Sequence, residues 1–239
     1  YTNFNSMCTV TFLPTLNNNF ILTSNRDEQS SRETDLPMKY FEDGVEMLFP
    51  KDKMAGGTWI GTSDKKRLVC VLNGAFVKHK RKENYTKSRG LIAKEVLKSD
   101  DFLTFINTLN LENIEPFTMV IVDWNTNQLN LFELIWDDNI KHFNELKNEA
   151  KIWSSSTLYS NEVKEIRRNW FNNWKEKNKF SKEAILNFHH SQIGDKEQSI
   201  LMKRSYVETV SITSVEKNDF SIEMNYEDII HSKKIKMKF

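Results

Sequence analysis

The first strong hydrophobic pattern in the chain is an apolar, β-branched run over residues 7–13. Short runs rich in Val, Thr and Phe are typical of strands. Alternate residues of a strand point to the same face, so Cys8 and Phe12 should lie on one face together. A polar segment over 16–19 then predicts a turn, and the apolar run over 20–23 predicts the second strand of a β-hairpin.

Later parts of the chain repeat patterns of the same kind. Continuous or alternating apolar runs predict strands, and apolar residues three or four positions apart predict helices. The expected strands follow the glycine-rich segment 56–61 and lie near 67–73, 117–122, 129–135, 152–155, 206–213 and 220–225, and the expected helices begin near 88, 99, 160 and 181. Residues 30–55 show little periodicity, so we expect an irregular segment there, and a basic tail after the last strand.

The order of these elements is strands, two helices, strands, two helices and strands. In the run over residues 67–72, both the odd- and the even-numbered positions are mainly apolar, which is typical of a strand that is covered on both faces. Together these observations favour an α+β fold of mainly antiparallel strands, with two packed sheets and a helical layer outside each. No repeat or linker divides the chain, so we expect one domain over 7–239, preceded at 1–6 by an extension or an expression remnant.

Composition changes this picture little, but it argues against several classes of function. The 34 Lys and Arg residues nearly balance the 33 Asp and Glu residues, so no global basic field attracts nucleic acid. No apolar run approaches the roughly 18 residues of a membrane span. The two cysteines are too few for a disulfide framework and fit a reducing compartment. We therefore expect a cytoplasmic protein with no stable membrane insertion and no nucleic-acid partner.

Two local basic segments could contact phosphate, but each has a simpler interpretation. Residues 78–82 are typical of a solvated loop. In the third expected helix, the apolar spacing that includes Ile166 predicts a core face, with Arg167 and other basic residues on a charged outer face. His189 and His190 are adjacent and lack the i, i+4 spacing of a helical metal pair, so we assign no metal and no cofactor.

Cys8 directly follows a possible initiator methionine, Met7. If translation began there and the methionine were removed, Cys8 would become residue one. A terminal cysteine carries both a nucleophilic thiol and a possible base, its own α-amine. The alternative is a cysteine that is buried as a small hydrophobe, which is common. The polar residues 24–28 come straight after an apolar strand, and the alternative there is a charged turn.

Five short segments form an ordered set: Met7-Cys8, 22–28, 56–61, Leu72-Asn73 and 88–90. Together they resemble the family named for its Asn-Arg-Asp-Glu (NRDE) signature, which includes the transport and Golgi organisation protein 2 homologues. The resemblance implies a four-layer αββα sandwich of the N-terminal-nucleophile (Ntn) hydrolase type. Within that fold it is similar to the bile-salt hydrolases and penicillin V acylases, which also begin with cysteine.

The resemblance also implies catalytic roles. Cys8 would be the nucleophile and Arg26 would favour its thiolate. Asp27 or Glu28 would hold Arg26 or the amine in position. Asn73 falls at the end of a core strand, where the related acylases carry an oxyanion-hole asparagine, and its amide could donate a hydrogen bond to a tetrahedral intermediate.

Residues beside this set would contact the substrate. We assign this role to Asn25 and Glu28, to Trp59 beside a glycine pair, and to Ser156, which stands where relatives have an asparagine ahead of the second helical block. Strand alternation puts Asn25 and Arg26 on opposite faces, and the sequence alone does not decide which of them faces Cys8.

Two functions follow from these observations, and neither predicts an oligomeric state. The first is a hydrolase that cleaves the linear amide bond of a small molecule through an acyl-enzyme on Cys8. The second is a non-catalytic carrier of a lipid-like or haem-like ligand on the same fold, which the links of eukaryotic relatives to membrane trafficking suggest. The clustering of polar residues in the signature favours the first.

Overall fold

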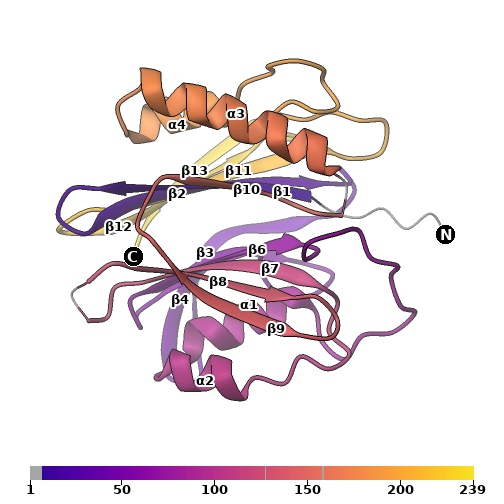
Figure 1. Cartoon of the computed structure of the whole chain (residues 1–239). Coiled ribbons are helices and arrows are strands. Elements are labelled where there is room, and N and C mark those ends of the chain that lie inside the picture. Colours follow the sequence, from indigo (N-terminus) through magenta and orange to yellow (C-terminus); the bar gives the residue numbers. More distant parts are fainter. Residues whose placement is uncertain (1–6, 127, 158) are drawn as a thin grey trace. The chain divides into compact units, whose positions relative to one another are not determined.

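The computed structural model describes residues 7–126, 128–157 and 159–239, so the predicted extension at 1–6 lies outside the described residues. The chain forms two compact units (Figure 1). Unit 1 combines the residues up to Ser31 with Glu149–Phe239, and unit 2 is the intervening segment Arg32–Asn148. Each unit is an antiparallel sheet with two helices, and we describe each by itself.

Unit 1 contains a six-stranded sheet in the order β10-β1-β2-β11-β12-β13. Every neighbouring pair in it is antiparallel. Its elements are β1 (Met7–Thr15), β2 (Asn19–Glu28), β10 (Lys151–Ser154), β11 (Glu208–Lys217), β12 (Ile222–Asp228), β13 (Lys233–Lys238), α3 (Asn161–Lys177) and α4 (Lys182–His189). The predicted β1–β2 hairpin is confirmed, and its turn uses Asn17 and Asn18 at positive φ, which asparagine tolerates.

The polar signature residues 24–28 continue β2 and do not form the turn that was the alternative. β2 pairs with β1 on one side and with β11 on the other, so its backbone groups are satisfied by two ladders. The polar side chains 24–28 are all buried. A central strand therefore carries the signature, and the sheet register fixes which face each signature residue occupies.

Helices α3 and α4 cover one face of the unit 1 sheet (Figure 1). Ser160 and Ser181 cap them, and the predicted starts of the two helices near 160 and 181 are confirmed. Phe171 of α3 packs with Ile185 and Phe188 of α4 in the core beneath them. The predicted division of α3 is wrong in one respect, because Arg167 is fully buried and Ile166 is 36% exposed.

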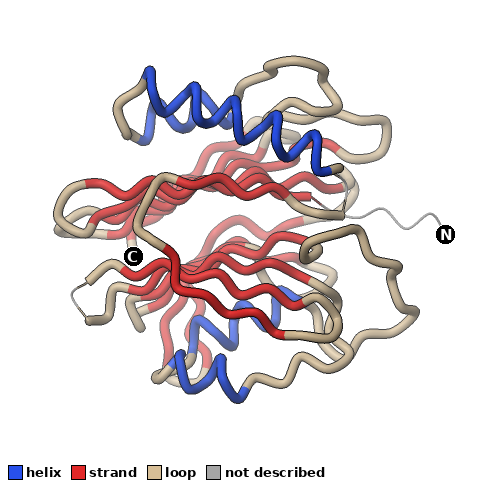
Figure 2. The backbone as a smooth tube through the Cα atoms, in the orientation of Figure 1, coloured by secondary structure: helices blue, strands red, loops and turns tan. Residues whose placement is uncertain are grey.

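Unit 2 contains a seven-stranded sheet in which the strands lie side by side in sequence order. Its elements are β3 (Thr34–Glu42), β4 (Val45–Asp52), β5 (Ile60–Ser63), β6 (Arg67–Asn73), β7 (Phe117–Asp123), β8 (Asn130–Trp136), β9 (Lys141–Leu146), α1 (Arg89–Lys98) and α2 (Phe102–Thr108). Figure 2 shows α1 and α2 on one side of this sheet and the long loop that joins β6 to α1. Ser88 and Asp101 cap the two helices, close to the predicted starts.

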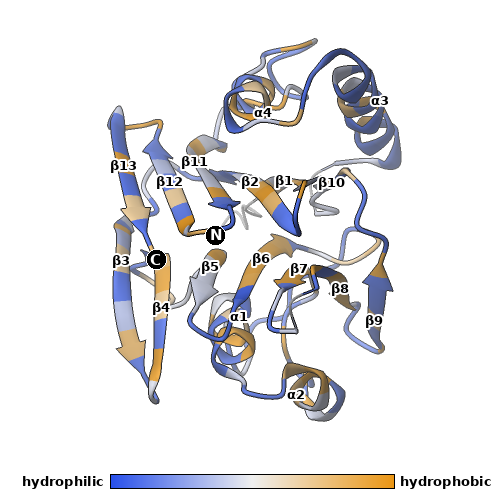
Figure 3. Cartoon of the chain, turned by 90° about the vertical axis from the view of Figure 1, so that its left-hand side faces the viewer, coloured by the Kyte–Doolittle hydropathy of each residue, from blue (hydrophilic) through white to orange (hydrophobic). Residues whose placement is uncertain are grey.

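The core of unit 2 lies between α1 and α2 and the central strands of its sheet. Figure 3 shows the hydrophobic colours along β6 and β7. All seven residues of β6 are buried, which confirms the strand predicted to be covered on both faces. Arg67 is buried as well, and its charged group is satisfied by hydrogen bonds. Its Nε donates to Asp123 at 3.0 Å, and its Nη1 donates to the carbonyl of Val96 at 2.8 Å. None of the helices in the described ranges has the length and apolar composition needed to cross a membrane.

Two predictions about segments at sheet edges are wrong, and a third edge strand has no predicted counterpart. Residues 30–55 form the β3–β4 hairpin, and the register of that hairpin is irregular between Asp35 and Met38, where Pro37 cannot donate to the ladder. The segment over 141–146 is strand β9, and the predicted basic tail forms strand β13. β9 and β13 are mostly polar, and almost every residue of β3, β9 and β13 is partly or fully exposed, so hydrophobic periodicity gives these three edge strands little signal. The fourth edge strand, β10, was predicted.

Two of the family segments in unit 2 meet at a close backbone contact. The N–H of Thr58 donates to the carbonyl of Gly90 at 3.3 Å. A Cβ atom on Gly57 would lie 2.4 Å from the carbonyl carbon of Gly90, which is closer than any real contact. The glycines of segments 56–61 and 88–90 are therefore needed for this packing of a loop on the start of α1.

Candidate active site

Cys8 is the second residue of β1 and lies between β10 and β2. The backbone N–H of Ser155 donates to the Cys8 carbonyl at 3.1 Å, and the Cys8 residue is 3% exposed. In the ladder with β2, Cys8 stands directly opposite Arg26. Opposed residues of an antiparallel pair project to one face with Cβ atoms about 5 Å apart. Arg26, and not Asn25, is therefore the signature residue beside Cys8.

Glu28 shares that face with Arg26, two residues along β2. Its Oε2 lies 4.0 Å from Nη2 of Arg26, and both side chains are about 95% buried. A guanidinium beside a thiol stabilises the thiolate, and a carboxylate fixes the guanidinium in turn. Of the two acids predicted to hold Arg26, the structure places Glu28 beside it.

Asn25 lies on the opposite face, under α3 and α4, where it holds the end of α4. Its Nδ2 donates to the carbonyls of His189 at 3.0 Å and Ile200 at 2.9 Å. Its Oδ1 lies 2.7 Å from Nδ1 of His189, whose Nε2 lies 2.8 Å from Oγ1 of Thr11. Because Nδ2 is the donor to both carbonyls, Oδ1 accepts, and the histidine carries its proton on Nδ1. Burial lowers the pKa of His189 to about 3, with the charges of His190 and Arg167 adding to the effect.

Asp27 lies on the same helical face, opposite Met7 in the ladder. Its Oδ1 accepts from the Thr209 hydroxyl at 2.6 Å, and its Oδ2 has no hydrogen-bond partner among the described residues. Complete burial raises the pKa of Asp27 to about 7, although the hydrogen bond from Thr209 and the charges of Arg167 and Arg204 oppose the shift. Asp27 and Asn25 are thus not brought to the face of Cys8.

An irregularity in β11 allows this arrangement. Thr209 pairs with Asp27 and Ser211 pairs with Arg26, so Val210 is an extra residue in the ladder. Without the extra residue, Thr209 and Ser211 would project to the same face. The bulge turns Thr209 toward Asp27 and leaves Ser211 beside Arg26, which is a common use of bulges near active sites.

Arg167 is a buried residue of this region that the sequence pattern did not reveal. Its Nη1 donates to Oγ1 of Thr9 at 2.6 Å, its Nε donates to the carbonyl of Gln198 at 2.9 Å, and its Nη2 donates to the hydroxyl of Tyr159. The guanidinium also lies 3.7 Å from the centre of the Tyr159 ring. Since it faces the sheet from α3, its charge acts on Asp27 and His189. The one sequence feature that could have indicated the burial of Arg167 is its position next to the apolar face of the helix.

Three buried hydroxyls share the face of Cys8. They belong to Ser24, Ser211 and Thr213, and none has a hydrogen-bond partner in the described part of the chain. Ser211 stands opposite Arg26, and Thr213 stands opposite Ser24. Each buried hydroxyl without a partner costs about 1–3 kcal/mol. This face therefore carries unused hydrogen-bonding capacity beside Cys8.

Ser156 follows β10 and is close to Cys8 in the fold, because its neighbour Ser155 bonds the Cys8 carbonyl. Nζ of Lys164 donates to Oγ of Ser156 at 2.7 Å. Burial, with the charge of Arg168, holds the pKa of Lys164 below its usual value. The predicted substrate-binding serine is therefore tied to an amine on α3.

The two remaining predicted residues, Asn73 and Trp59, belong to unit 2. Asn73 ends β6 and shares its parity with Val69 and Val71, which pack beneath α1. Trp59 is 8% exposed, and its carbonyl accepts from the N–H of Val71 at 2.7 Å. Asn73 is thus fixed at the end of β6, and Trp59 is fixed in the loop before β5 by its bond to β6. The described residues contain no group of three or more His, Cys, Asp and Glu side chains placed to share a metal ion.

Comparison with protein families gives a match over nearly the whole chain. The model of the family described as "Transport and Golgi organisation 2" matches residues 7–237. No curated protein matches the chain. The family match begins at Met7, directly before the candidate nucleophile.

Solved structures with a similar fold include hydrolases with low sequence identity to this chain. A penicillin V acylase from Agrobacterium tumefaciens is 9% identical with a TM-score of 0.61, over 97% of this chain and 86% of the acylase. An N-acylethanolamine-hydrolyzing acid amidase orthologue from Caenorhabditis elegans is 12% identical with a TM-score of 0.58, over 87% of this chain and 92% of the amidase. A variant of the conjugated bile acid hydrolase from Clostridium perfringens is 11% identical with a TM-score of 0.56, over 96% and 92%. These likenesses confirm the predicted α+β fold of Ntn-hydrolase type, with antiparallel sheets.

Proposed function

The chain belongs to the transport and Golgi organisation 2 family, and we propose that it is a hydrolase that cleaves the C–N bond of a linear amide through a thioester on Cys8. The single observation that carries the proposal is the placement of Cys8 opposite Arg26 on the face of the unit 1 sheet that α3 and α4 do not cover. The hydrolase fold supports it, and the substrate class is taken from the acylase and the acid amidase that share this fold.

The reaction requires Cys8 to be the first residue of the mature chain. An α-amine has a reference pKa of about 7.7–8.0, so near neutral pH it can accept the thiol proton. The thiolate then attacks the amide carbon and forms a tetrahedral intermediate. The protonated amine returns the proton to the leaving nitrogen as the C–N bond breaks, and water hydrolyses the thioester to release the acid.

Other residues of β2 support this step in different ways. Arg26 favours the thiolate and Glu28 fixes Arg26. Asp27 stays a prediction as a group that acts on the α-amine of Cys8; it stands opposite Met7 in the ladder and projects to the other face of the sheet. Asn73 stays a prediction as the oxyanion donor, and its replacement by alanine should lower kcat by a factor that corresponds to about 2.7–4 kcal/mol.

The test compares the two buried cysteines of the chain, Cys8 and Cys70. Intact mass first identifies the amino-terminal residue of protein expressed from its own gene. A β-lactam or activated amide should then add one acyl group to the wild type and to Cys70→Ala, and none to Cys8→Ala. Arg26→Met should keep the fold and slow acylation near pH 7. Acylation that persists in Cys8→Ala, or a chain that retains Met7, would overturn the proposal.

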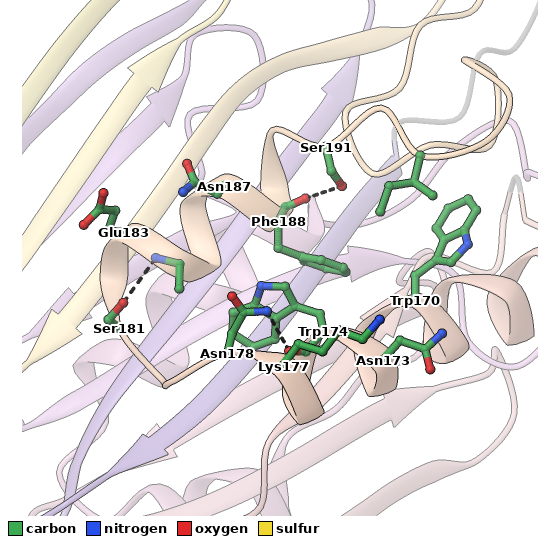
Figure 4. Close-up of a pocket in the computed structure, with 12 residues that line it drawn as sticks. Trp170, Asn173, Trp174, Lys177, Asn178, Ser181, Glu183, Asn187, Phe188 and Ser191 are labelled. Carbon is green, nitrogen blue, oxygen red and sulfur yellow. Dashed lines mark hydrogen bonds between the residues drawn. The ribbon is translucent and has the colours of Figure 1, made fainter.

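A groove between α3 and α4 favours the second candidate function, a lipid-like ligand carrier. The groove has a volume of about 610 Å³, and Trp170, Trp174, Phe188 and Ile193 line its apolar part (Figure 4). Trp174 and Phe188 pack with ring centres 5.7 Å apart, and asparagines surround them. The described lining includes no His, Cys or Met to ligate a haem iron, so an acyl chain suits it better than haem.

The carrier function predicts saturable binding of a fluorescent fatty acid that Trp174→Ala weakens and Cys8→Ala leaves unchanged. Absence of saturable binding would exclude it. Because α3 and α4 cover the sheet face opposite Cys8, the groove and the Cys8 thiol lie on different sides of the unit 1 sheet. The two functions can therefore be tested separately.

A further inference from the structure

A lysine of α3 lies beside the position that becomes the amino terminus when the chain begins at Cys8. Nζ of Lys164 donates to Oγ of Ser156 at 2.7 Å. Ser156 is buried and directly follows Ser155, whose N–H donates to the carbonyl of Cys8 at 3.1 Å. Hydrolysis of an amide by Cys8, in the steps given above, leaves this lysine without a role.

The pairing of Cys8 with Ser155 determines the direction of the Cys8 nitrogen. In an antiparallel ladder, the N–H and the carbonyl of one residue point toward the same neighbouring strand. Because the carbonyl of Cys8 faces Ser155, the Cys8 nitrogen also faces that side and not β2. Opposed Cα atoms are about 5.5 Å apart and the next Cα follows at about 3.8 Å, so we expect Nζ of Lys164 on the order of 8 Å from this nitrogen.

Lys164 brings a positive charge to this position. Burial and the charge of Arg168 hold the pKa of Lys164 below its usual value of about 10.4, but an amine with such a pKa stays protonated near pH 7 unless the shift is several units. A like charge disfavours the protonated form of a nearby amine. At about 8 Å, with an effective dielectric constant of about 20–40, this repulsion lowers the pKa of an amine by about one pH unit.

The other charged or titratable groups around the amine compensate one another more closely. They are Arg26, Asp27 and Glu28 on β2, Tyr159 in the loop after β10, and Arg167 on α3. Arg26 and Glu28 form an ion pair at 4.0 Å. Asp27, whose pKa burial raises to about 7, and Arg167 act on one another through opposite charges. Burial raises the pKa of Tyr159, which therefore stays neutral. Lys164 adds a further positive charge to this set.

We propose that Lys164, anchored by Ser156, is a positioning residue whose charge keeps the α-amine of Cys8 unprotonated near neutral pH. The inference rests on the proposed function. The free amine can then take the proton from the thiol as the bond from sulfur to the amide carbon forms. Lys164 neither gains nor loses a proton in this step, so it acts only through the amine.

The first test measures the pKa of the α-amine without any substrate. It uses the full mature chain with Cys8→Ala, in which intact mass verifies that the chain begins at position 8. The rate at which trace acetic anhydride acetylates the α-amine is followed from pH 5 to 9. We expect Lys164→Gln to raise the pKa of this amine by about one pH unit, and Lys164→Arg, which keeps the charge, to leave it nearly unchanged.

Lys177→Gln is the matched control, because Lys177 is the last residue of the same helix and the substitution removes the same charge. It should leave the pKa of the α-amine unchanged. An equal rise in Lys177→Gln, or no rise in Lys164→Gln, would overturn the inference. Ser156→Ala releases the anchored ammonium and should give a smaller rise in the same direction.

The second test follows acylation of the protein with an intact Cys8 by a β-lactam as a function of pH. Lys164→Gln should slow acylation about tenfold at pH 6 and leave it nearly unchanged at pH 9, where the amine is free in both proteins. An equal loss at both pH values would indicate a structural defect and overturn the inference. A raised pKa without any acylation of the wild type would refute the amidase and leave the effect of Lys164 standing. Acylation with an unchanged pKa would do the reverse.

Discussion

Replacing Asp27 by asparagine should change the way in which the stability of the protein depends on pH. The pKa of Asp27 is raised from 3.8 to about 7 in the folded protein, chiefly by burial. Between these values the folded chain holds a proton that the unfolded chain has lost, so this group makes wild-type stability fall as pH rises. The shift of about three pH units corresponds to about 4 kcal/mol. Asparagine does not titrate, so the variant should gain this amount relative to the wild type between pH 4 and 7.

His189 acts in the opposite direction over nearly the same range. Its pKa is lowered from 6.5 to about 3, so between these values the unfolded chain holds a proton that the folded chain lacks. Its contribution to stability is present above pH 6.5 and is lost as pH falls toward 3. Each group changes the stability by about 1.4 kcal/mol per pH unit, with opposite signs, so the two effects nearly cancel in the wild type between about pH 4 and 6.5.

Urea unfolding at half-unit steps of pH from 4 to 7.5 would measure these slopes, and differences from the wild type remove the contributions of all other groups. The difference in unfolding free energy, variant minus wild type, should rise with pH for Asp27→Asn and fall with pH for His189→Gln. For the double variant it should stay nearly constant. Thr209→Val removes a hydrogen bond that lowers the pKa of Asp27, so it should extend the Asp27 effect to higher pH. A flat difference for Asp27→Asn would refute the assignment of a buried, protonated Asp27.

Four other substitutions test three separate features of the fold, each by urea unfolding. Asn25→Ala should cost about 3 kcal/mol, because it removes three buried hydrogen bonds, and a loss below 1 kcal/mol would contradict the structural role of this residue. Gly57→Ala should cost about 3 kcal/mol through its backbone clash, whereas Gly44→Ala, at positive φ in open space, should cost only about 1 kcal/mol; equal losses would contradict the close contact. Thr213→Val should raise stability by about 1 kcal/mol, since it removes an unpartnered buried hydroxyl, and a decrease would show that the hydroxyl has a partner.

The sequence predicts the interior of this fold better than its edges. Strand β6 and the helix caps at Ser88, Ser160 and Ser181 follow from local patterns, because burial and capping leave direct traces in residue type. The edge strands β9 and β13 do not, because most of their residues are polar and none is buried, whereas the apolar residues of the edge strand β10 made it predictable. Pro37 also conceals the β3–β4 hairpin, since proline usually argues against a strand.

The candidate site was predictable as a set of residues but not as an arrangement. The signature identifies Asn25, Arg26 and Asp27, yet their faces depend on the register of β2 against β1 and β11. The bulge at Val210 and the burial of Arg167 depend on contacts with distant parts of the chain. Such contacts leave no periodic trace in the sequence.

The division of the chain into units has a consequence for its synthesis on the ribosome. Strand β2 receives its second neighbour from β11, and the bond from Thr209 to Asp27 spans 182 positions of sequence. The hairpin β1–β2 must therefore wait with an unpaired edge until almost the entire described chain has emerged, while the consecutive strands of unit 2 can pair as they appear.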